Sequence, residues 1–157
     1  MQNEIDDPVR STVGSNKSPS REFSWRAAFL GASVGIAGPA YFGTLAANLT
    51  LWVWIAQGQT LQAAYAQLFQ YKFTFVVVMH LVADACFAFA SGWVSAAYGR
   101  GAALVQGVAA GLLSASFPLV MWLSPNPGEM PLLFRALSLG IPILGSVVGG
   151  LAHARKT

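Results

Sequence analysis

His80 and Asp84 lie four residues apart in the stretch VVMHLVADAC, which is otherwise apolar. In a helix this spacing puts the imidazole and the carboxylate on one face, where they can touch. Such a pair can form an ion pair, relay a proton or bind a metal ion. Which of these applies depends on the element that carries the pair and on its surroundings.

Three interpretations of the pair stay open. As structural glue, it contributes about 0.6–2 kcal/mol to helix association. As part of a proton or cation pathway, it acts as intramembrane His and Asp residues often do. As a metal site, it uses an HxxxD spacing, and the segment MHLVADA resembles the second-span metal motif of cation diffusion facilitators. Zinc takes four ligands, and no other predicted span carries His, Asp or Glu. A second copy of the chain would have to complete the site, so we predict no metal and no cofactor.

The composition places the chain in a membrane. Of its 157 residues, 55% are hydrophobic and only 10% are charged, against roughly 25% charged in soluble domains. So few charges cannot cover a surface that faces water. The net charge of +3 is too small to indicate a nucleic-acid partner. The lipid bilayer is therefore the predicted surrounding.

Apolar runs predict an all-α, polytopic membrane protein with four transmembrane helices. The predicted spans are about 27–56, 73–98, 102–123 and 132–152, within a transmembrane domain of residues 27–157. Residues 1–26 are polar and are predicted to form a disordered cytoplasmic tail. Between the first two spans, glutamines alternate with apolar residues at helical spacing. This segment is interpreted either as a short amphipathic helix at the membrane surface or as a plain connecting helix.

The distribution of Lys and Arg predicts the orientation. With four spans both termini share a side, and that side holds seven of the nine basic residues; only Lys72 and Arg135 lie on the other. The positive-inside rule then puts both termini in the cytoplasm.

Small residues recur every four positions in each predicted span. Hydrophobicity cannot drive helices together inside a bilayer, but close backbone contact can. We therefore predict a Gly/Ala-packed bundle, within one chain or between chains. The packing positions expected are Gly31, Gly35, Gly92, Gly107, Gly111, Gly145 and Gly149.

Asp84 is predicted to lie near the bilayer centre, where a carboxylate facing lipid costs at least about 2.5–3.5 kcal/mol. It should therefore face the bundle or a water-filled cavity. Matching of depths indicates Asn48 on the first span and Ser114 on the third as polar neighbours of the pair. A catalytic triad built from Ser114, His80 and Asp84 is disfavoured, because acid and base on adjacent turns of one helix leave the imidazole poorly placed. The chain is thus not expected to be an enzyme.

The segment MHLVADACFAFASGWVSAAYGRGAALVQGVAAGLLSASFPLVMWLSPNP resembles small, uncharacterised bacterial inner-membrane proteins of the YagU-like kind, over roughly residues 75–127. The resemblance implies a bacterial inner membrane and a stress-related role. We expect a structural or accessory membrane component with a buried polar pair, and a homo-oligomer or a membrane complex as partner. The alternative is a small transporter or channel subunit that moves protons or cations through His80 and Asp84.

Overall fold

The computed structural model describes residues 23–69, 74–99, 101–123 and 132–156. They form five helices and, within these ranges, no strand, which confirms the all-α prediction. The helices are α1 (Trp25–Ala56), α2 (Leu61–Phe69), α3 (Thr74–Gly99), α4 (Ala103–Leu123) and α5 (Leu132–Ala154). All but α2 are long and apolar enough to cross a membrane, so the chain is a membrane protein by the length and composition of its helices.

The helix boundaries lie within two residues of the predicted spans. The first helix begins at Trp25, earlier than predicted, because Ser24 caps it: the Ser24 hydroxyl accepts from the Ala27 amide at 3.4 Å. The proposed tail therefore ends before Trp25, and its residues 1–22 lie outside the described part of the chain. The predicted Pro/Gly loop, residues 124–131, also lies outside it.

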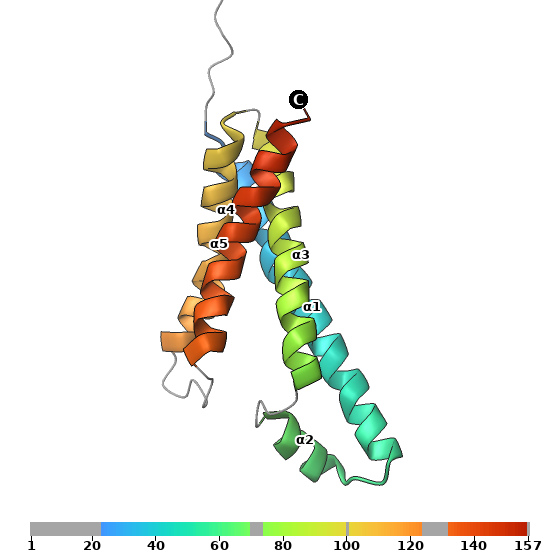
Figure 1. Cartoon of the computed structure of the whole chain (residues 1–157). Coiled ribbons are helices and arrows are strands. Elements are labelled where there is room, and N and C mark those ends of the chain that lie inside the picture. Colours follow the sequence, from blue (N-terminus) through green and yellow to red (C-terminus); the bar gives the residue numbers. More distant parts are fainter. Residues whose placement is uncertain (1–22, 70–73, 100, 124–131, 157) are drawn as a thin grey trace, which may run out of the picture.

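The four long helices run alternately up and down, with both the start of α1 and the end of α5 at one end, here called the termini end (Figure 1). Helix α3 packs against α1, α5 and α4, and α4 packs against α5 and α1. Figure 1 shows the α1/α3 pair and the α4/α5 pair close together at the termini end and diverging toward the end where α2 lies, here called the α2 end. The pair His80–Asp84 sits in the diverging half.

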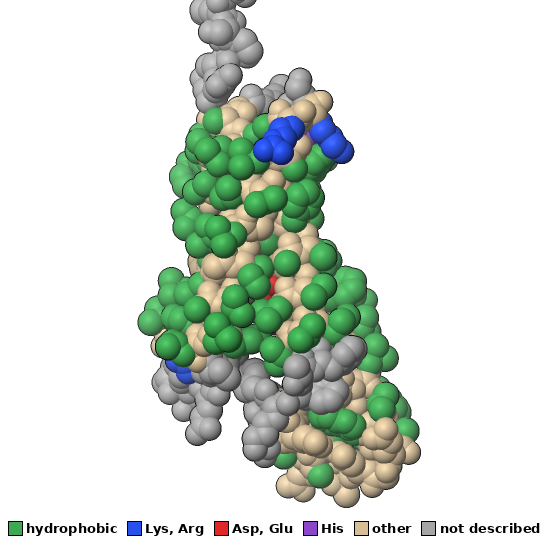
Figure 2. Space-filling model, in the orientation of Figure 1, with side chains coloured by type: hydrophobic (Ala, Val, Ile, Leu, Met, Phe, Trp, Pro, Cys, Tyr) green, Lys and Arg blue, Asp and Glu red, His purple; other side chains and the backbone are tan. Residues whose placement is uncertain are grey.

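The distribution of side chains is the reverse of that in a soluble protein. The largest fully buried side chains are polar: Gln106, Ser91, Ser95 and Ser146. Large apolar side chains such as Trp52 and Leu123, 72% and 77% exposed, lie on the outside, and hydrophobic side chains are spread over the face seen in Figure 2. In water such a surface would be costly, whereas lipid tails accept it. The packing thus supports the membrane assignment independently of hydropathy.

Glycines allow the helix backbones to approach closely at the termini end. A Cβ at Gly107 in α4 would lie 2.6 Å from the carbonyl oxygen of Ser146 in α5, and one at Gly92 in α3 would overlap the same oxygen. All seven predicted packing glycines have an atom of a neighbouring helix within 2.8 Å of such a Cβ. Close backbone approach of this kind is what associates helices in lipid.

Helix α2 folds back against the end of α1. Its buried Ala64 packs with Leu51 and Trp54 of α1, and α1 is the long helix that it mainly contacts. The turn between the two helices uses Gly58 at φ 91°, a conformation that glycine adopts without strain.

Candidate functional site

His80 and Asp84 face the junction of three helices. The imidazole Nε2 lies 3.7 Å from a carboxylate oxygen of Asp84. The α1 residue opposite the imidazole is Gly43, where a Cβ would come within 2.8 Å of His80 Nδ1. On the α5 side the imidazole stacks on the ring of Phe134, with centroids 6.2 Å apart. The absence of a side chain at Gly43 therefore makes room for His80 between α1 and α5.

Asp84 is almost enclosed by its neighbours. Its side chain is 11% exposed, against 34% for that of His80. Asp84 is the only acid among the described residues, so the small red area set between apolar side chains in Figure 2 belongs to it. The carboxylate thus lies below the apolar surface, and the imidazole beside it is the more exposed member of the pair.

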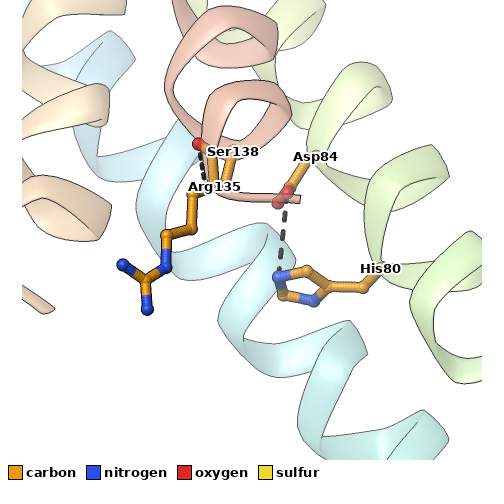
Figure 3. Close-up of polar contacts among 4 residues, drawn as sticks. All are labelled: His80, Asp84, Arg135 and Ser138. Atoms are coloured by element: carbon orange, nitrogen blue, oxygen red, sulfur yellow. Dashed lines mark hydrogen bonds and ion pairs between the residues drawn. The ribbon is translucent and has the colours of Figure 1, made fainter. Parts of the chain in front are cut away.

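Figure 3 shows the pair together with two polar residues of α5, Arg135 and Ser138. The close-up shows Asp84 turned toward the part of α5 that carries Ser138, whose hydroxyl donates to the Arg135 carbonyl at 2.9 Å. The Arg135 side chain leaves in another direction, and its guanidinium lies 5.7 Å from the ring centroid of Trp122. Arg135 therefore does not form an ion pair with Asp84 in this arrangement.

The geometry limits what the pair can do. A separation of 3.7 Å is within ion-pair range but exceeds a hydrogen bond, so a small movement of the imidazole would close the contact. His80 can bind a proton and then neutralise the carboxylate. No group of three or more His, Cys, Asp or Glu side chains gathers anywhere in the described part of the chain. One copy therefore offers a proton site or a helix contact rather than a complete metal centre.

The structure does not place Asn48 beside the pair. Asn48 is exposed on α1, five residues beyond Gly43. Five residues rotate a helix by about 140°, so Asn48 cannot share the face on which Gly43 meets His80. The predicted contact of Asn48 with the pair therefore fails on its direction around the helix.

Ser114 lies in a different polar cluster. Its hydroxyl oxygen would be 2.5 Å from a Cβ at Gly35, and that of Ser91 would be 3.2 Å from the same point. Because Gly35 precedes Gly43 by eight residues, this cluster is about 12 Å from His80 along α1. Both hydroxyls are buried, and neither has a hydrogen-bond partner within the described residues.

A third polar cluster closes the termini end. The amide of the fully buried Gln106 reaches the backbone of Ser24: its oxygen faces the Ser24 N–H at 2.6 Å and its nitrogen faces the Ser24 carbonyl at 3.1 Å. Ser95 of α3 donates to the Gln106 carbonyl at 3.1 Å. Gln106 of α4 therefore holds the start of α1 through its side chain and contacts α3 through its backbone carbonyl.

Prolines leave carbonyls without a helical hydrogen bond near two of the three polar sites, the His80–Asp84 pair and the second cluster. Proline has no N–H, so the carbonyl four residues earlier loses its helical donor. Pro39 frees the carbonyl of Gly35 and Pro118 frees that of Ser114, which are both residues of the second cluster; Pro142 frees that of Ser138, near Asp84. The carbonyls that lack a helical N–H donor thus belong to residues of the polar clusters or to a residue near Asp84.

Of the four candidate polar residues, the structure brings together His80 and Asp84 and places Asn48 and Ser114 elsewhere. Sequence reasoning missed the contact at Gly43 and the role of Ser91. The signal that could have indicated the second cluster is the position of Pro39 and Pro118, each four residues after a member of the cluster. No protein-family model, no curated protein and no solved structure matches this chain.

Proposed function

We propose that this protein is a structural or accessory component of a bacterial cytoplasmic membrane, without enzymatic activity. The four long helices form a Gly/Ala-packed bundle in the bilayer, α2 lies at the membrane surface, and both termini face the cytoplasm. A second copy of the chain or a membrane complex is the partner of such a component. The resemblance to YagU-like proteins agrees with this location.

The observation that carries the proposal is the position of His80 and Asp84 at the point where close glycine contacts end. Toward the termini end, close contacts hold α3 to α5; a Cβ added at Gly145, for example, would lie 2.6 Å from the Cβ of Ala88. Toward the α2 end the helix pairs diverge (Figure 1). There His80 contacts both α1 and α5 through Gly43 and Phe134, so the polar pair joins helices that backbone packing no longer joins.

The energy of the pair favours a structural role. An unpaired carboxylate near the bilayer centre costs about 2.5–3.5 kcal/mol or more, which a partner and burial reduce. Asp84 has only 11% of its side chain exposed and His80 as its partner. Burial of the pair between the three helices therefore stabilises their association in the diverging half.

The test compares Asp84→Asn and His80→Ala with the parent protein in proteoliposomes, measuring unfolding and ion flux on the same samples. A structural role predicts a loss of about 0.6–2 kcal/mol of stability for either variant, with no flux above empty liposomes in any sample. Unchanged stability in both variants would contradict the proposal. Reporters fused to the two termini test the orientation. Activity, at either terminus, of a reporter that works only outside the cytoplasm would contradict the proposed cytoplasmic location of both termini.

A second candidate function is favoured by the partial opening of the site. His80 is one-third exposed while Asp84 is nearly buried, so a proton or cation could reach the carboxylate past the imidazole. The protein would then be a small transporter or channel subunit. Flux driven by a pH or cation gradient in the parent, lost in an Asp84→Asn protein that remains fully stable, would establish this function in place of the structural one.

A further inference from the structure

In the second polar cluster, formed by Gly35, Ser91 and Ser114, the serine hydroxyls differ from those of the other serines in the described helices. Exposed hydroxyls such as those of Ser33 and Ser116 donate to carbonyls of their own helix at 2.9 and 2.6 Å. The buried Ser95 and Ser146 donate to neighbouring helices. Ser91 and Ser114, 0% and 3% exposed, do neither.

These two hydroxyls converge on one place from two helices. Both oxygens lie within 3.2 Å of the point where Gly35 of α1 would carry a Cβ. A buried hydroxyl without a hydrogen bond costs about 1–3 kcal/mol, and the cost should be larger still in lipid, where no solvent reaches it. Two such groups side by side indicate that the site binds something that both oxygens contact.

The same three residues supply further oxygens. Pro39 and Pro118 leave the carbonyls of Gly35 and Ser114 without a helical N–H donor, and neither serine hydroxyl donates to them. The site therefore offers two hydroxyl oxygens that meet at one point, and two of its residues carry a carbonyl that lacks its helical donor. Carbonyls freed where a membrane helix is interrupted are suited to bind monovalent cations.

The charge of the site selects the class of ion. Divalent cations are bound in proteins mainly with the help of carboxylates. The only acid among the described residues, Asp84, lies seven residues from Ser91, about 10 Å along α3. A site made of neutral oxygens can hold at most one positive charge, and the close approach of the two hydroxyls favours a small ion.

We propose that Gly35, Ser91 and Ser114 form a binding site for a dehydrated monovalent cation of the size of Na⁺, distinct from the His80–Asp84 pair. The bound ion joins α1, α3 and α4 in the closely packed half. The site does not depend on the accessory function proposed above, because it shares no residue with that pair.

The first test is the thermal unfolding of the full chain in detergent, with NaCl replacing choline chloride at constant ionic strength. The midpoint should rise in a saturable manner, by about 3–6 °C at ten times the dissociation constant, and KCl should give a smaller rise. Ser91→Ala and Ser114→Ala should abolish the rise, whereas Ser33→Ala and Ser116→Ala should retain it. The absence of a Na⁺ effect in the parent chain would overturn the proposal, as would an effect that persists in both buried-serine variants.

A proline variant separates ion binding from packing. Pro118→Ala restores an N–H donor to the Ser114 carbonyl and removes a helix-breaking residue. The variant should unfold at a higher temperature than the parent without Na⁺, yet require at least several-fold more Na⁺ to reach half of its stabilisation. An unchanged Na⁺ requirement would show that the freed carbonyl takes no part in the site.

Discussion

Replacing Gly149 of α5 by alanine tests whether close backbone contact holds the helices together. A Cβ at this position would overlap the carbonyl oxygen of Phe89 in α3 and lie 3.0 Å from the backbone nitrogen of Trp93. Neither atom can move aside unless the whole of α3 moves. Gly140 of the same helix is a matched control, because an added Cβ there meets nothing within 4 Å.

The expected difference can be worked out from two terms. Alanine is favoured over glycine inside a helix by about 0.8–1.0 kcal/mol, and this gain applies to both positions. Overpacking costs about 1–3 kcal/mol, and this cost applies only to Gly149→Ala. The difference between the two variants should therefore be about 1–3 kcal/mol in favour of Gly140→Ala.

Reversible unfolding in mixed detergent micelles, followed by circular dichroism, measures this difference. Gly92→Ala provides a check from the opposite helix, since its Cβ would overlap the Ser146 carbonyl. If either substitution alone already separates α3 from α5, the loss of stability in the Gly92→Ala/Gly149→Ala double variant should be smaller than the sum of the two single losses. Equal stability of Gly149→Ala and Gly140→Ala would refute the assigned contact between α3 and α5.

Two further substitutions test the buried polar contacts. Ser146→Ala removes a buried hydrogen bond of 3.0 Å to α3 and should cost about 0.6–2 kcal/mol in the same unfolding assay, whereas Ser33→Ala, on an exposed face, should change stability by less than about 0.5 kcal/mol. Gln106→Leu leaves the Ser24 N–H without the Gln106 oxygen, whereas the Ser24 carbonyl keeps the Ala28 N–H; hydrogen exchange at the start of α1 should become faster, and unchanged protection there would contradict this role of Gln106.

The sequence predicted the helices well because length and apolar content determine a span directly. The predicted span 132–152 agrees with α5, Leu132–Ala154, and the first span was displaced only at its N-terminus, where Ser24 caps α1. The small residues Gly107 and Gly149 lie at helix contacts, since a four-residue spacing marks one face of a helix. Local patterns of this kind need no knowledge of the neighbouring helices.

The composition of the site could be predicted only in part, because depth in the membrane does not give direction around a helix. His80 and Asp84 belong to one helix, so their spacing alone sets their contact at 3.7 Å. Asn48 and Ser114 lie on other helices, whose rotation depends on all their contacts together. A single sequence carries no direct record of that rotation, and Asn48 proved to be exposed.

The arrangement of polar groups explains why the two halves of the protein differ. In the closely packed half, glycine brings carbonyls and serine hydroxyls to the interface, as at Gly107 and Ser146, and neutral groups suffice because the backbones touch. In the diverging half this contact is lost, and the only described acid, Asp84, is found there with His80. Both residues belong to α3, so the pair reaches the diverging helices through the contacts of the imidazole with Gly43 of α1 and Phe134 of α5. Replacing His80 by alanine removes these contacts and should consequently loosen the α2 end while the glycine contacts keep the termini end closed.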